Sequence, residues 1–240
     1  MLNIRRLGFF SGATTYQRYG FISLEPLITS KIIPQHDEKY TQQEDIFLTQ
    51  LGDINVSIVE CSLAKLRYVN NKQQVSKVFS GLIVELVSPT RINQQVILHA
   101  RWSKLMNWLQ QTPMPLNQKV DISVPGCEEK YAIYATNQTL AKQVFSQEVL
   151  QQLAEFDNQL DVAQPEISLF HNRLLILLHR PENFLGAPSL SQNTNKNQVL
   201  NSFLQQVEMM NQLIKIGEQI LKNVQSEKSI MHDCGNLNSK

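Results

Sequence analysis

Short hydrophobic runs with the pattern of β-strands dominate the chain between residues 46 and 135. In these runs β-branched and other apolar residues either alternate with polar ones or form continuous stretches of strand length. Six strands are predicted, at Ile54–Glu60, Ala64–Val69, Val78–Val87, Gln95–Ala100, Lys119–Val124 and Lys130–Ala135. The paired asparagines within VNNKQQ predict a turn, and the sequence PGCEE predicts the turn of a hairpin between the last two strands.

Three segments change from the strand period to the helix period. Residues 102–109 are predicted to form a short helix, because Trp102, Leu105, Met106 and Leu109 fall on one helix face. Residues 137–157 are predicted to be helical with a break at Ser146, which can cap a second helix. A long helix is predicted over residues 199–225. Between the second and third helical segments, PEISLFHNRLLILLHRP contains His171 and Asn172 between two β-rich runs, which is the clearest hairpin signal in the chain.

The order of these elements predicts the fold class and the domain limits. Strands and helices do not alternate regularly, so we expect an α+β fold: a mostly antiparallel β-sheet with helices packed on one side and a long C-terminal helix. The predicted divisions are an N-terminal arm (1–45), an α+β core domain (46–190), a linker (191–198), the C-terminal helix (199–225) and a disordered tail (226–240).

The C-terminal helix bears a hydrophobic stripe that only Gly217 interrupts. Its width favours packing on the protein's own sheet, whereas the alternative is that part of it binds another helix, either in a homo-oligomer or in a different protein. Trp108 is a further candidate contact residue, because it points away from the apolar face that includes Trp102. The candidate interaction surface comprises Leu200, Phe203, Val207, Met210, Ile214, Leu221 and Trp108.

Composition and charge exclude several classes of protein. Of the 240 residues, 42% are hydrophobic, enough for a sizeable core, and 22 Lys and Arg residues balance 21 Asp and Glu residues, so no general positive field exists to attract nucleic acid. Three unpatterned cysteines favour the reducing cytoplasm. No run reaches the ~20 apolar residues of a membrane span. We therefore expect a cytoplasmic protein that is not integral to a membrane, with docking at its inner face through Leu2–Phe10 as an alternative.

No set of residues has the spacing of a known catalytic or cofactor site. The chain lacks a glycine-rich phosphate-binding motif, the acidic pairs fall in predicted loops, and neither Cys61 nor Cys127 belongs to a nucleophile motif. His232, Asp233 and Cys234 are adjacent but have no second ligand pair at zinc-site spacing. We expect no cofactor and no metal, and the sequence favours a non-enzymatic protein over an enzyme.

The run KVFSGLIVELVS contains two residues that are unusual in a buried strand. Gly81 is predicted to mark a bulge or the close approach of another element. Glu85 would face the same side of the sheet, where a buried carboxylate requires a partner or water.

The chain resembles the bacterial family catalogued as domain of unknown function 3137. The stretches that resemble it are YTQQEDIFLTQLGDINVSIVECSLAKL, KVFSGLIVEL, EKYAIYATNQTLAKQVFSQEVLQQLAEF and ISLFHNRLLILLHRPENFLGAPSL, within residues 40–190. The resemblance implies no activity and no catalytic residues. It implies a domain on the cytoplasmic side of a bacterial membrane, normally preceded by membrane helices, whereas this chain has only the segment Met1–Ser30 in their place.

Two hypotheses from different classes follow. The leading one is a protein-interaction or scaffold module that contacts a protein partner or a second copy through the C-terminal helix or an exposed sheet edge. The other is an enzyme or small-ligand binder with a pocket between sheet and helices, which requires His99, His171 or His179 to converge with Glu85 or Glu129.

Overall fold

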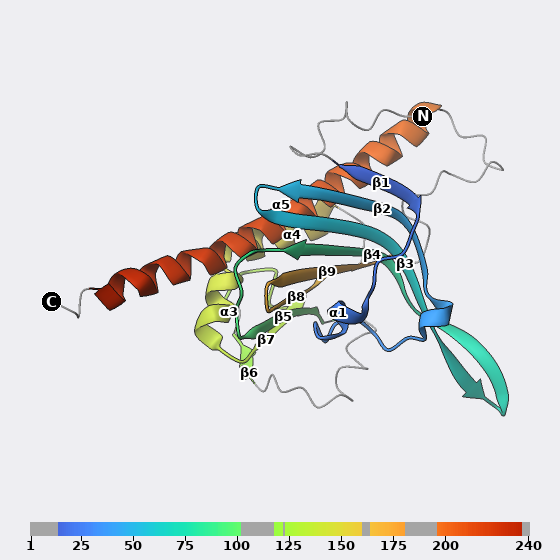
Figure 1. The fold of residues 1–240 in the computed structure, drawn as a ribbon, viewed down its shortest axis with the longest axis horizontal. Coiled ribbons are helices and arrows are strands. Elements are labelled where there is room, and N and C mark those ends of the chain that lie inside the picture. The colour runs from blue at the N-terminus through green and yellow to red at the C-terminus, as the bar shows by residue number, and fades with distance from the viewer. Residues whose placement is uncertain (1–13, 102–117, 122, 160–163, 181–195, 237–240) are drawn as a thin grey trace.

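Nine strands form one antiparallel sheet in the computed structural model, which describes residues 14–101, 118–121, 123–159, 164–180 and 196–236. The strands have the order β1-β2-β3-β4-β9-β8-β5-β7-β6 (Figure 1). Their bounds are β1 Thr15–Tyr19, β2 Gln42–Leu51, β3 Ile54–Val69, β4 Lys72–Val87, β5 Gln95–Ala100, β6 Gln118–Val120, β7 Tyr131–Ala135, β8 Glu166–Phe170 and β9 Arg173–His179. Every pair of neighbouring strands is antiparallel, which confirms the predicted α+β class.

Three helices cover one face of the sheet: α3 Gln138–Val144, α4 Gln147–Gln159 and α5 Lys196–Asn236. Asn137 caps α3 by accepting a hydrogen bond from the backbone N–H of Leu140 at 3.1 Å, and the helical stretch breaks at Ser146 as predicted. The apolar sides of these helices and the residues of β3, β4, β5, β8 and β9 that face them form the larger of two hydrophobic clusters. This arrangement confirms the prediction of helices packed on one side.

The opposite face is covered by a segment that we call the strap, residues 21–36, which includes the short helix α1 Glu25–Ile28 (Figure 1). Leu24, Leu27, Ile32 and Ile33 of the strap belong to the second hydrophobic cluster, with residues from the central strands. Both faces of the central sheet are therefore buried, which explains why its strands form nearly continuous apolar runs rather than strict alternations.

Several elements differ from their predicted bounds. The N-terminal arm contains the short helix α1 and also β1, the 3₁₀ turn η2 Glu38–Tyr40 and the start of β2, and the hydrophobic pattern predicted neither strand. The predicted strands at 54–60 and 64–69 are one strand, β3. α5 extends beyond 199–225 in both directions, into the predicted linker and the predicted disordered tail. The predicted helix at 102–109, including Trp108, lies outside the described residues.

The two glycines that the sequence singled out both allow a close approach. A Cβ atom on Gly81, whose φ is +151°, would lie 2.0 Å from the carbonyl oxygen of Leu178 in β9, so the predicted close approach is confirmed. A Cβ atom on Gly217 would lie 3.0 Å from the Leu86 side chain and 3.1 Å from that of Leu174, so at this interruption of the α5 stripe the helix backbone packs closely on leucines of β4 and β9.

Candidate functional site

The two longest strands, β3 and β4, extend beyond the neighbours that flank them in the sheet. β2 pairs with β3 only as far as Ser62, and β9 pairs with β4 only from Gly81 onward. The two strands continue to pair with each other out to Val69 and Lys72. We call residues Ala64–Lys77 the projecting hairpin, which extends away from the body at the lower right of Figure 1.

The register of the projecting hairpin gives it two different faces. Leu66 pairs with Val75 and Tyr68 with Gln73, so one face presents mainly apolar and aromatic side chains, with the pair Ala64–Lys77 at its base. The other face presents most of the cations, because successive cross-strand pairs alternate between the two faces of the ribbon. The pairs on this second face are Lys65 with Ser76, Arg67 with Gln74 and Val69 with Lys72.

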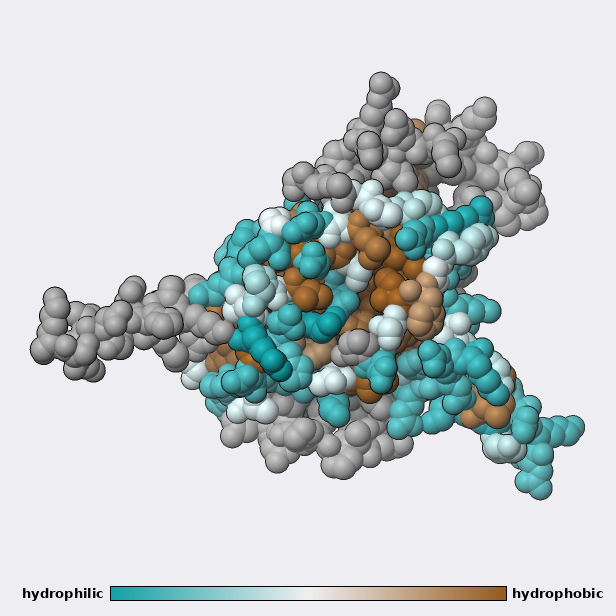
Figure 2. Space-filling view, in the orientation of Figure 1, coloured by the Kyte–Doolittle hydropathy of each residue, from teal (hydrophilic) through white to brown (hydrophobic). Residues whose placement is uncertain are grey.

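The outer residues of the hairpin contribute almost nothing to the core. Tyr68 is 70% exposed, Val75 48% and Val69 46%, and none of the three belongs to a hydrophobic cluster. Figure 2 shows the projection as mainly hydrophilic with a small hydrophobic patch. Exposed apolar side chains that the fold does not use are typical of a contact surface.

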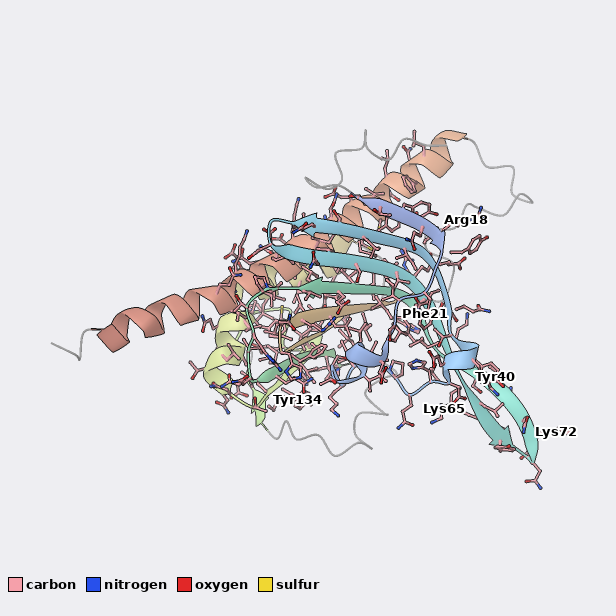
Figure 3. All side chains as sticks on the ribbon, in the orientation of Figure 1. Arg18, Phe21, Tyr40, Lys65, Lys72 and Tyr134 are labelled. Carbon is pink, nitrogen blue, oxygen red and sulfur yellow. The ribbon has the colours of Figure 1, made fainter. Side chains whose placement is uncertain are left out.

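Contacts with the segment before β2 hold the base of the hairpin. The carboxylate of Asp37 accepts a hydrogen bond from the backbone N–H of Leu66 at 2.7 Å, and the Asp37 N–H donates to the carbonyl of Ala64 at 3.0 Å. Lys65 Nζ donates to the side-chain oxygen of Gln35 at 2.9 Å. Figure 3 shows Lys65 near this base and Lys72 at the outer tip.

A groove of about 730 Å³ adjoins this base. Its lining includes Phe21, Ile28, Lys31 and His36 of the strap, together with Lys65 of the hairpin. Acidic and basic side chains both line it, and the His36 ring hydrogen-bonds the backbone carbonyl of Pro34 at 2.9 Å. The groove therefore shows no single-sign charge that would select one class of ligand.

The C-terminal helix divides the predicted contact surface into two parts. Val207, Met210, Ile214 and Leu221 are buried in the larger hydrophobic cluster, so these four side chains pack on the protein's own sheet. At the start of α5, Leu200 is 47% exposed and Leu204 39%, while Phe203 is half-buried against the core. Only this first part of the stripe has side-chain surface available to a partner.

The residues required for the enzyme hypothesis do not converge on one another. Glu85 pairs with Arg173 and accepts a hydrogen bond from Ser57 Oγ at 3.3 Å, which supplies the partners that a buried carboxylate requires. Glu85 in β4 and His99 in β5 are three strands apart, a separation of about 14 Å across the sheet. His171 forms the turn between β8 and β9, where its φ is +52°.

His99 instead pairs with a residue that the sequence analysis did not name. Its Nδ1 lies 2.9 Å from Glu166 Oε2, and both residues are buried on the neighbouring strands β5 and β8, each next to the last pair of the register, Leu98 with Ile167. On the same face, Gln95 Nε2 and Ser168 Oγ donate to the carbonyl of Ser30 at 2.8 and 2.7 Å. These neighbouring bonds fasten the strap to the sheet, which gives polar residues on this face a structural role.

Neither buried cysteine has the environment of a nucleophile. Burial raises the pKa of the Cys61 thiol to about 12, and burial together with the nearby Asp157 raises that of Cys127. Both thiols are thus protonated at neutral pH. Within the described part of the chain, no group of three or more His, Cys, Asp and Glu residues could hold a metal ion.

Asp157 and Tyr131 form a buried polar pair that joins α4 to β7. The Tyr131 hydroxyl donates to Asp157 Oδ1 at 2.8 Å, and Lys130 Nζ lies 3.6 Å from Oδ2. Burial raises the pKa of Asp157 and that of Tyr131. The pair attaches the helix layer to the sheet, because one partner comes from each layer.

The family model of DUF3137, described as a protein of unknown function, matches residues 77–219. The chain belongs to this family. No curated protein matches the chain. A solved structure with some similarity is the crystal structure of the mycobacterial trehalose monomycolate transport factor A, TtfA, at 13% identity and a TM-score of 0.38, covering 85% of this chain and 88% of that one.

The family match begins at Lys77, so it includes the inner part of β4 and most of the core but excludes nearly all of the projecting hairpin. Of the helices in the described part of the chain, none has the length and hydrophobicity to cross a membrane. The sequence signal that could have revealed the hairpin is the presence of cations without any acidic residue on the two sides of Asn70-Asn71.

Proposed function

We propose that this member of the DUF3137 family is a non-enzymatic interaction module and that the projecting hairpin is its contact surface. The observation that supports this proposal is the exposure of Tyr68, Val69 and Val75 on an extension that the core does not need. The body supplies a rigid base, because β3 and β4 continue inward between two covered faces. The hairpin is thus an exposed sheet edge on a fixed support.

Crosslinking from the hairpin tests this proposal. A photo-reactive amino acid in place of Tyr68 should yield adducts in bacterial cells that produce the protein, whereas the same group in place of Lys142, an exposed residue of α3, should yield none. A deletion variant, which has no position 68 to label, serves for measurements of stability and binding: it lacks Leu66–Val75 and joins Lys65 to Ser76, which are opposite in the register, through an Asn-Gly turn. Absence of adducts to both protein and lipid from the hairpin position would contradict the proposal.

A second contact surface is favoured by the exposed leucines at the start of α5. Leu200 and Leu204, with the half-buried Phe203, form a small apolar surface that fits a second copy of the chain or a protein partner. If a second copy binds there, light scattering should give twice the monomer mass for the full chain and the monomer mass for Leu200→Ser/Leu204→Ser. A full chain that is monomeric at all concentrations tested would exclude self-association.

A further inference from the structure

We infer that the projecting hairpin docks on an anionic lipid bilayer. The inference rests on the proposed function, since it names the partner of the same surface. Three properties of the hairpin support it: uncompensated positive charge, an apolar face with an aromatic residue, and its projection from the body.

The charge of the hairpin is of one sign. Between Glu60 and Glu85 the chain has four cations, Lys65, Arg67, Lys72 and Lys77, and neither an acidic residue nor a histidine. Within the described residues none of the four forms an ion pair. Although the charges of the whole chain nearly balance, the hairpin has a local positive surface. Anionic lipid headgroups are complementary to this positive surface.

Two acidic residues of the described chain, Asp37 and Glu38, lie in the segment that contacts the base of the hairpin. The Asp37 carboxylate is bound to the backbone N–H of Leu66, and Glu38 is in η2, next to Lys39, whose ammonium lies 4.7 Å from the Tyr40 ring centre. Lys65 reaches the neutral amide of Gln35 rather than a carboxylate. Positive charge therefore extends from the base to Lys72 at the tip (Figure 3).

The apolar face supplies the second component of interfacial binding. Leu66, Tyr68 and Val75 are on one side of the ribbon, and Tyr68 combines a hydrophobic ring with a polar hydroxyl, which suits the boundary between headgroups and acyl chains. Lys65, Arg67 and Lys72 on the other side have side chains long enough to bend toward the phosphates. Lys77 is on the apolar side at the base. Amphipathic elements rich in Lys and Arg bind anionic membranes through this combination.

The shape of the hairpin favours a bilayer over an acidic protein. It projects from the body as a narrow two-stranded ribbon (Figure 1), and of its residues only Lys65 lines the groove at its base. Tyr68, Val69 and Val75 are outside that groove, so it gives them no pocket of the kind in which hot spots of protein interfaces are desolvated. A lipid surface deforms around such a ribbon and requires no complementary cavity.

Vesicle co-sedimentation tests the inference on the full chain. Vesicles of phosphatidylcholine alone and vesicles with equal parts of phosphatidylglycerol are the probes. We expect binding to the anionic vesicles, release at high salt, and at least about a tenfold weaker apparent affinity for Arg67→Glu/Lys72→Glu. Tyr68→Ser/Val75→Ser should also weaken binding, because it removes the apolar contacts while the charge is unchanged.

A matched charge reversal distinguishes local from general electrostatics. Lys119→Glu/Lys142→Glu makes the same change in net charge at two exposed positions outside the hairpin and should bind anionic vesicles as the unaltered chain does. Circular dichroism should show that all variants are folded, since the hairpin residues replaced are exposed.

Three results would overturn the inference: no sedimentation with anionic vesicles, equal sedimentation with both kinds of vesicle, or equal loss in the two charge-reversed variants. If vesicles do not bind but position 68 crosslinks to protein in cells, the bilayer is the wrong partner and the interaction module stands. If neither vesicles nor crosslinks are found, the interaction module also fails.

Discussion

The inner and outer halves of β3 and β4 are the same two strands in two different environments. In the inner half, up to Leu63 in β3 and from Phe79 in β4, side chains on both faces are buried under helices or strap. In the outer half, residues with similar strand propensity, such as Val69 and Val75, face solvent. The difference shows that neighbouring strands and covering layers, and not local propensity, decided which half became core.

The outer half persists because the inner half fixes its register. An isolated two-stranded hairpin is only marginally stable in water. Here the cross-strand pairs continue from Val56–Leu86 in the core to Val69–Lys72 at the tip, with a single irregularity between Leu63 and Ala64. Pairing of β3 with β4 in the core therefore holds the projecting residues in register, which an isolated hairpin of these residues could not do stably.

The largest effect is expected where the inner half approaches β9. Gly81→Ala places a methyl group 2.0 Å from the Leu178 carbonyl oxygen, so β9 must move and the free energy of unfolding should fall by at least about 4 kcal/mol. Gly52→Ala is the control, because its φ of +61° is strained but nothing lies within 4 Å; a cost of about 1–2 kcal/mol is expected. Urea unfolding measures both, and similar losses would refute the close-approach explanation.

Two side-chain truncations, one in each half of β4, should lower the free energy of unfolding by different amounts, and this difference is the next largest expected effect. Leu82→Ala removes a fully buried side chain and should lower the free energy of unfolding by about 2–5 kcal/mol. Val75→Ala, in the outer half, should change it by less than about 0.5 kcal/mol. Thermal or urea unfolding of the two variants gives the comparison, and a large loss for Val75→Ala would mean that the hairpin contributes to the core after all.

The buried carboxylate of the inner half should have an intermediate effect. Glu85→Ala leaves the Arg173 guanidinium without its carboxylate but still partly exposed, so we expect a loss of about 1–2 kcal/mol. A double-mutant cycle with Arg173→Ala measures the coupling between the two side chains. If the two single losses simply add, the pair contributes no interaction energy of its own.

Removal of the outer half should have only a small effect on stability. The variant that joins Lys65 to Ser76 through Asn-Gly should unfold within about 1 kcal/mol of the full chain, because the ten removed residues, Leu66–Val75, are outside both hydrophobic clusters. Its vesicle binding should be lost nonetheless. A large drop in the unfolding midpoint would show that the hairpin is structural.

Sequence patterns predicted the elements that are locally regular. Gln95–Ala100 has the predicted bounds, and the hairpin around His171-Asn172 and the break at Ser146 are present. β2 was missed because a register shift between Glu44 and Phe47, with Asp45 at φ +50°, interrupts its alternation. β1 was missed because all five of its residues are exposed, which leaves no hydrophobic period to detect.

The candidate contact surface was predicted less well than the fold. The stripe of α5 was visible in the sequence, but a helix that packs on a sheet and one that binds a partner have the same periodicity. The hairpin residues were predicted as ordinary strand and turn, because nothing local shows that β2 and β9 end before the hairpin begins.

Composition and periodicity by themselves determined the α+β class, the antiparallel sheet and the helix with its glycine, because these depend on the spacing of apolar residues along the chain. The tertiary structure alone decided that Gly81 contacts the β9 backbone, that Glu85 pairs with Arg173, and that half of the β3–β4 hairpin has no neighbour in the sheet. These features depend on pairing between strands distant in sequence, and a local pattern does not specify that pairing.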